Sequence, residues 1–175
     1  MAVVGSAGVM ALSGCVAAPW SAPEQPRPAA GARVVDGRLE LWLGASCPGV
    51  TAVHVTAKDS AGQQVASWEA EAADPGGAYV ERIVVGGDNR ELRADSSSFN
   101  WNGAEVVDVE VGTASRDRAA SGYWAVKGLT EGGGPDEWLV QDRGWVTEQG
   151  YAELAASDGL HPVCEVPGIT WPGGR

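Results

Sequence analysis

Short runs in which apolar and polar side chains alternate dominate residues 38–111. Leu39, Leu41 and Leu43 alternate with Arg38, Glu40 and Trp42, for example, and the run 105–111 alternates valines with acidic residues. A period of two places successive side chains on opposite faces of a strand, so each run predicts a strand with one buried face. Other runs of strand length cover 53–58, 66–71, 78–85, 123–129 and 137–141.

Turn-forming residues separate these runs, as in Asp59-Ser60-Ala61-Gly62 and Gly132-Gly133-Gly134-Pro135. Half-buried strands joined by turns at regular spacing are typical of antiparallel sheets packed face to face. We therefore predict an all-β, mainly antiparallel fold: a single β-sandwich of about seven to eight strands over residues 34–166. Residues 167–175 are then expected to form a flexible tail.

One short helix is predicted near the C-terminus. Thr147 suits the N-cap position, and Val146 before it can pack against Tyr151 one turn into the helix. Tyr151 and Leu154 then share a face, and Gly159 suits the helix end.

The N-terminal segment begins with an apolar run that ends in Leu12-Ser13-Gly14-Cys15. This pattern resembles the lipobox of bacterial lipoproteins, in which a branched apolar residue and two small residues precede a cysteine. The resemblance implies that residues 1–14 are a signal peptide and that Cys15 carries a diacylglycerol on its thiol. Residues 1–14 contain no Lys or Arg, so we expect the cationic start of the signal to precede Met1. The alternative is that Cys15 is an ordinary residue in an apolar tail.

A lipid anchor also fits what surrounds Cys15. The preceding apolar run is shorter than the roughly 20 residues that span a bilayer, whereas two acyl chains give stable anchoring. Residues 15–33 carry Pro19, Pro23, Pro26 and Pro28 among small and polar residues, a composition that favours an extended tether. The predicted location is the outer face of the cell membrane, with the membrane as one partner.

The formal net charge of −11 excludes some classes of partner. A nucleic-acid-binding domain needs a basic surface to neutralise phosphates. A chain with such an excess of acidic residues is not expected to have that surface. The same charge disfavours a domain that lies on an anionic membrane surface. We therefore predict no nucleic-acid partner.

Cys15, Cys47 and Cys164 are the three cysteines. If Cys15 carries lipid, Cys47 and Cys164 remain, and in an exported protein they most simply form one disulfide. Two free thiols are the alternative. No further cysteine or histidine ligands cluster near them, so we predict no metal site and no cofactor.

No catalytic residue can be assigned from the sequence. His54 lies on the polar face of a predicted strand, and His161 lies in a predicted turn before Pro162. Neither the Gly-x-Ser-x-Gly nor the Ser-x-x-Lys motif occurs. Two same-face carboxylate pairs, Glu69 with Glu71 and Asp108 with Glu110, have the chemistry of a glycosidase pair or a calcium site. The favoured interpretation is that both lie on a solvated sheet face.

Aromatic residues supply the candidate ligand-binding positions. Phe99 and Trp101 lie in the long polar segment 88–102, where a sandwich usually places binding loops; alternatively they fold back over the sheet edge. Trp42 lies on the outer face of its predicted strand, either as an exposed binding residue or, as we favour, covered by the C-terminal helix or Trp145. Trp68, Trp124 and Trp138 are predicted core residues.

The block from Glu137 to Tyr151 resembles, in style only, small envelope lipoproteins of high-GC Gram-positive (actinobacterial) bacteria, and this resemblance implies no activity. Together these features favour a non-catalytic module that binds an envelope protein or glycan. The alternative is an envelope hydrolase in which Asp88 or Asp95 meets Glu105 or Asp108 in three dimensions.

Overall fold

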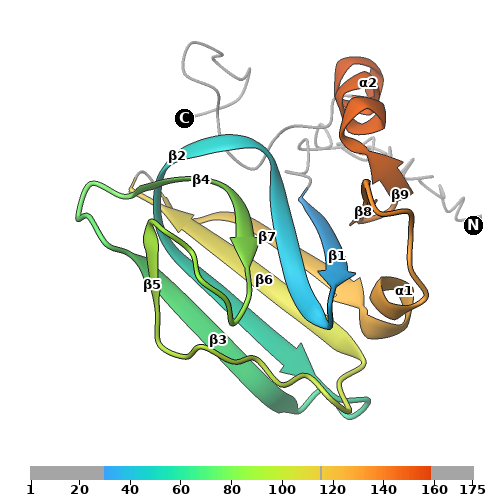
Figure 1. Ribbon diagram of the computed structural model, residues 1–175, viewed down its shortest axis with the longest axis horizontal. Helices are drawn as coiled ribbons and strands as arrows, with labels where there is room; N and C mark the ends of the chain where they lie inside the picture. The colour runs from blue at the N-terminus through green and yellow to red at the C-terminus, as the bar shows by residue number, and fades with distance from the viewer. Residues whose placement is uncertain (1–29, 115, 159–175) are drawn as a thin grey trace, which may run out of the picture.

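The computed structural model describes residues 30–114 and 116–158. Those residues form an all-β fold in which every strand pairing is antiparallel (Figure 1). The elements are β1 (Gly31–Val35), β2 (Arg38–Lys58), β3 (Gln64–Ala72), β4 (Ala78–Val84), β5 (Leu92–Ala94), β6 (Val106–Thr113), β7 (Arg116–Ala125), α1 (Val126–Thr130), β8 (Glu137–Val140), β9 (Gly144–Thr147) and α2 (Glu148–Asp158). The predicted fold class is confirmed.

The long strand β2 belongs to both layers of the sandwich. Its first part pairs with β1 and β4, and its last part pairs with β3 and β6. The first layer therefore has the order β4-β2-β1-β8-β9, and the second layer has the order β5-β3-β2-β6-β7. A single hydrogen-bonded sheet is thus folded into two layers, as the path of β2 in Figure 1 shows.

The prediction of separate strands at 38–43 and 53–58 was wrong, because both runs and Cys47 belong to the one strand β2. Gly44 and Gly49 adopt positive φ, and the register of β2 against β4 shifts on either side of Cys47. The glycines and Pro48 do bend the chain, but Cys47 and Val50 still pair with β4. A bulged strand that turns a corner has the same local sequence signals as a strand followed by a loop.

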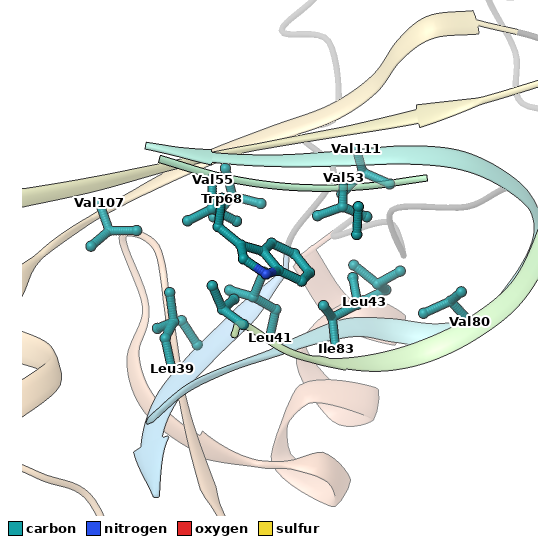
Figure 2. Close-up of a cluster of buried hydrophobic side chains, with 14 of the residues drawn as sticks. Leu39, Leu41, Leu43, Val53, Val55, Trp68, Val80, Ile83, Val107 and Val111 are labelled. Atoms are coloured by element: carbon teal, nitrogen blue, oxygen red, sulfur yellow. The ribbon is translucent and has the colours of Figure 1, made fainter. Parts of the chain in front are cut away.

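The main core lies between the two layers. Figure 2 shows Leu41 and Ile83 of the first layer facing Val53 and Trp68 of the second layer. Trp68 and Trp124 are buried in this core, with exposed fractions of 0% and 3%, and Trp138 is also 0% exposed. The prediction that these three tryptophans are buried is confirmed.

The observed strand count of nine in the described residues exceeds the predicted seven to eight. Strands β1, β5 and β9 were not foreseen, and β1 begins at Gly31, inside the predicted tether. The predicted strand 123–129 was wrong in its second half. There the chain turns into α1, which buries Leu129 and lets the Thr130 hydroxyl donate to the Val126 carbonyl.

The C-terminal helix α2 begins where the sequence predicts. The Gly150 N–H donates to Thr147 Oγ1 at 3.1 Å, so Thr147 is the N-cap, and Val146 packs against the cluster that contains Tyr151. In Figure 1 the helix stands beside the β8–β9 hairpin, outside the two layers. Within residues 30–114 and 116–158, neither helix is long and apolar enough to cross a membrane.

Several predictions concern residues outside the described part of the chain. These are the signal peptide, the lipidated Cys15, most of the tether, His161, Cys164 and the tail 167–175. Cys47 itself is fully buried in β2. Its pairing with Cys164 remains a prediction.

Candidate binding site

A second hydrophobic cluster lies on the outer face of the first layer. We call it the aromatic cluster: Trp42 of β2, Trp138 and Val140 of β8, and Tyr151 of α2. The Trp42 ring lies 5.7 Å from that of Trp138 and 4.8 Å from that of Tyr151, which meets it edge-on. These contacts place the cluster beneath the C-terminal helix.

Trp42 is covered, as favoured from the sequence. Only 4% of its side chain is exposed, so its ring offers no open surface to a ligand. Its Nε1–H is buried and has no hydrogen-bond partner among the described residues. A buried donor without a hydrogen bond costs about 1–3 kcal/mol. The polar groups of this cluster are therefore less completely hydrogen-bonded than those of the main core.

Two glycines make room for these rings. A Cβ on Gly31 of β1 would lie 2.7 Å from the Trp138 Cβ, and a Cβ on Gly44 would lie 2.6 Å from the Tyr151 hydroxyl oxygen. Gly44 also has φ of +77°, a conformation that other residues rarely adopt. Burial of Tyr151 raises the pKa of its hydroxyl to about 12.

Two arginines from different strands of the first layer approach the Trp138 ring. The guanidinium carbon of Arg33 lies 4.1 Å from the ring centroid, and that of Arg82 lies 5.5 Å away. Both distances fit cation–π contact. Arg33 lies on β1, Arg82 on β4 and Trp138 on β8, so the sheet brings together residues that are far apart in sequence.

The two arginines differ in how firmly they are held. Arg33 donates from Nε to Glu40 at 2.9 Å and from an Nη atom to the Pro135 carbonyl at 2.8 Å, and it is mostly buried. The Arg82 guanidinium pairs with Glu148 of α2 at 2.5 Å, and the two side chains are 49% and 45% exposed. Arg33 is therefore a structural residue, whereas Arg82 is accessible.

Two cavities are lined in part by Arg82. One has a volume of about 430 Å³ and is lined by Arg33, Arg82, Pro135, Asp136, Thr147, Glu148 and Gln149. The other has a volume of about 220 Å³ and is lined by Tyr79, Val80, Arg82, Val84, Asp88, Asn89, Arg90, Glu91 and Leu92. We call the residues that line these two cavities the Arg82 surface.

Among the described strands β4 pairs only with β2 and so lies at an edge of the sheet, and its backbone contributes to the Arg82 surface. The Val85 N–H donates to Leu39 of β2, whereas the Val84 N–H and carbonyl both bond the Asn89 side chain. Because main-chain groups alternate in direction along a strand, the Arg82 N–H and carbonyl point away from β2, as those of Val84 do. Farther along, the Tyr79 N–H donates to the Glu91 carboxylate.

The predicted binding residues Phe99 and Trp101 lie elsewhere. Their rings stack with centroids 6.5 Å apart, and both are partly buried against the main core. Their loop is tied down by the Trp68 Nε1–H, which donates to the Ser96 carbonyl at 2.9 Å. This arrangement fits the alternative in which the pair folds over the core, and a binding role for it stays a prediction.

His54 is exposed, as predicted. On the outer face of the second layer it stands between Glu69 of β3 and Glu110 of β6 in the strand register. Glu69 and Glu71 are solvated, and Asp108 forms an ion pair with Lys58. The described residues contain no group of three or more His, Cys, Asp or Glu side chains placed to hold a metal ion.

The structure does not bring Asp95 and Asp108 together. The Asp95 N–H bonds Glu69 of β3, and Asp108 lies on β6, so three strand spacings separate them. At roughly 4.8 Å for each spacing this is about 14 Å, more than the roughly 5–9.5 Å between the carboxylates of a glycosidase.

No sequence pattern marks Arg33, Arg82 or Glu148 as a candidate site residue, and no spacing in the sequence links Arg82 to Trp138 or to the helix. Comparison with family models, curated proteins and solved structures yields no match.

Proposed function

We propose that this protein is a lipid-anchored, non-catalytic binding module of the bacterial cell envelope, and that its Arg82 surface binds an extended segment of a partner protein. The lipobox resemblance at Leu12-Ser13-Gly14-Cys15 and the proline-rich stretch after it support the anchor. The tether then holds the acidic domain away from the membrane.

One observation carries the binding role. Among the described residues β4 pairs only with β2, the register turns the Arg82 peptide group towards the open edge, and Arg82 lines both cavities. An extended peptide that runs along such an edge gains main-chain hydrogen bonds, while cavities on its sides accept its side chains. The neighbouring outward groups at Tyr79 and Val84 are already bonded by Glu91 and Asn89, so the contact is short and centred on Arg82.

The chemistry of the Arg82 surface favours a protein partner. Its lining mixes three arginines with four acidic residues, and it also includes Tyr79, which is 62% exposed. Arginine and tyrosine are enriched where proteins bind one another. The exposed peptide group adds a contact that an extended polypeptide can satisfy with its own backbone.

Site-specific photo-cross-linking in living cells tests this surface. The cross-linkable residue p-benzoylphenylalanine replaces Tyr79 in one strain and Tyr123 in another, because these two tyrosines are similarly exposed, at 62% and 56%. We expect a discrete protein adduct from position 79 and none from position 123. A third strain with the probe at Trp101 tests the stacked aromatic pair; adducts from position 101 alone would move the binding site there.

The main-chain contact is tested by Arg82→Pro against Arg82→Ala, each combined with the probe at position 79. Proline is tolerated on an edge strand where its missing N–H faces outward. Both variants remove the guanidinium, but only proline removes the N–H. A weaker adduct with proline than with alanine supports strand pairing, and equal adducts contradict it.

Mass spectrometry of the native mature N-terminus tests the anchor. We expect a diacylated Cys15 as the first residue, and an unmodified N-terminus at another residue would refute it. A Cys15→Ala variant should be released into the medium or retained as a precursor. Peptide mapping without reduction should join Cys47 to Cys164, whereas two free thiols would refute the bridge.

A further inference from the structure

We infer that the partner segment presents an acidic side chain and that its carboxylate replaces Glu148 on Arg82. This inference rests on the proposed function, because it names the chemical group that the Arg82 surface recognises. Glu148 is then an internal ligand that occupies the site until a partner arrives.

The Glu148 carboxylate is held by two donors. Its Oε1 atom accepts a hydrogen bond from Arg82 at 2.5 Å and another from Trp138 Nε1 at 3.3 Å. Two donors from different strands thus converge on one carboxylate oxygen. Donors arranged in this way favour an ionised carboxylate over a neutral amide, because bonds to charged acceptors are the stronger ones.

Glu148 is also placed so that it can leave Arg82 easily. It is the first residue of α2 and is 45% exposed, as a side chain in a surface ion pair. Exposed ion pairs contribute little to stability, since water screens them and holding two side chains in place costs entropy. An external carboxylate can therefore displace it at small cost.

Arg33, the other arginine at Trp138, is held more firmly than Arg82. Glu40 and the Pro135 carbonyl hold its guanidinium, and its side chain is only 18% exposed. Asp136 also lines the larger cavity. Arg82 is thus the arginine of this cavity that a ligand can reach, with about 430 Å³ of space beside it.

The indole N–H resonance of Trp138 in two-dimensional NMR of the full chain reports on this site directly. The resonance is assigned by its loss in Trp138→Phe. The probe is N-acetyl-glutamate N-methylamide, and the matched neutral probe is the glutamine analogue, both titrated at constant ionic strength. The proteins are the wild type, Glu148→Gln, and Glu148→Gln combined with Arg82→Gln.

We expect the glutamate probe to shift the Trp138 resonance saturably in Glu148→Gln, with an affinity about five-fold higher than in the wild type. The added Arg82→Gln change should abolish the shift, and the glutamine probe should give none. Glu153→Gln removes another carboxylate from α2, one bonded to Gln149, and should behave as the wild type.

Three results would overturn the inference: equal shifts with the two probes, no saturable shift in Glu148→Gln, or the same enhancement in Glu153→Gln. If the Arg82 surface binds a partner without recognising a carboxylate, any of these results would be found together with an intact cross-link from position 79. Loss of that cross-link together with no probe binding would instead refute the proposed function itself.

Discussion

The main core and the aromatic cluster bury apolar surface in two different ways. The main core contains twenty-two buried residues, drawn from both layers of the sandwich, and the described residues include no buried charged side chain. The aromatic cluster contains four buried residues, of which three are aromatic, and it is bordered by Arg33, Arg82 and Glu148. It also holds the Nε1–H of Trp42, which has no hydrogen-bond partner within the described part of the chain.

The main core is therefore the rigid scaffold of the molecule, and the aromatic cluster is the part that can open locally. Stability grows with the apolar area that is buried, so the main core carries most of it. A small cluster closed by one short helix can open without unfolding the sheets, because regions with few buried contacts have low local stability. Binding sites are usually drawn from such regions, and the Arg82 surface borders this one.

The largest expected effect is the loss of a ring from the main core. Trp68 is fully buried, and Trp68→Ala removes its packing and leaves a cavity between the layers. We expect the free energy of unfolding to fall by about 3–5 kcal/mol, measured by denaturant titration. A loss below about 1 kcal/mol would show that the layers close around the gap, so that the main core is not tightly packed.

A smaller and local effect is expected from Tyr151→Ala. Tyr151 is the only buried residue of α2 for which burial is described, so its loss should detach the helix. We expect a cost of about 2–3 kcal/mol, limited because the helix can unfold by itself. Limited proteolysis should then cut within 148–158 while the sheets stay intact. Unfolding of the whole domain would instead show that the aromatic cluster and the main core do not open separately.

The stability of the aromatic cluster should also depend on pH in the alkaline range. Tyr151 has a pKa of about 12 in the folded protein, raised by burial from its ordinary value of 10. The folded state therefore holds this proton more tightly, so the contribution is fully present below pH 10 and is lost as the pH rises towards 12.

Chemical denaturation of the wild type and of Tyr151→Phe at pH 8 and at pH 11.5 isolates this effect. The wild type should lose about 1–2 kcal/mol more than the variant between the two pH values. Equal losses would mean that the hydroxyl is solvated in the folded state.

The smallest expected effect is that of Glu148→Gln. Its ion pair with Arg82 is half exposed, so the free energy of unfolding should change by no more than about 1 kcal/mol. Thermal unfolding measures this change. A larger loss would show that Glu148 fixes the helix in place and is not free to leave Arg82.

Much of this architecture could be predicted because alternation is a local signal. The runs around Leu41, Val55 and Val109 specify which side chains face the main core, and the structure buries all three. The N-cap role of Thr147 could also be predicted, since an N-cap needs only a hydroxyl at the right position. Both kinds of inference use residues close together in the sequence.

The candidate site could not be predicted in this way. Arg33, Arg82, Trp138 and Glu148 meet only because β1 lies between β2 and β8, with β4 on the other side of β2. Strand order is a long-range property that no local pattern encodes. The corner in β2 was missed for the opposite reason, because Gly44 and Gly49 carry the local signals of a turn.

Native-state hydrogen exchange of the indole N–H groups tests most directly whether the two hydrophobic regions are separable. The Trp68 indole donates to Ser96 in the main core, and the Trp138 indole donates to Glu148 beside the aromatic cluster. We predict that Trp68 exchanges only through global unfolding and that Trp138 exchanges through a local opening of lower free energy, unaffected by small amounts of denaturant. Exchange of both groups with the same free energy and the same denaturant dependence would contradict the account.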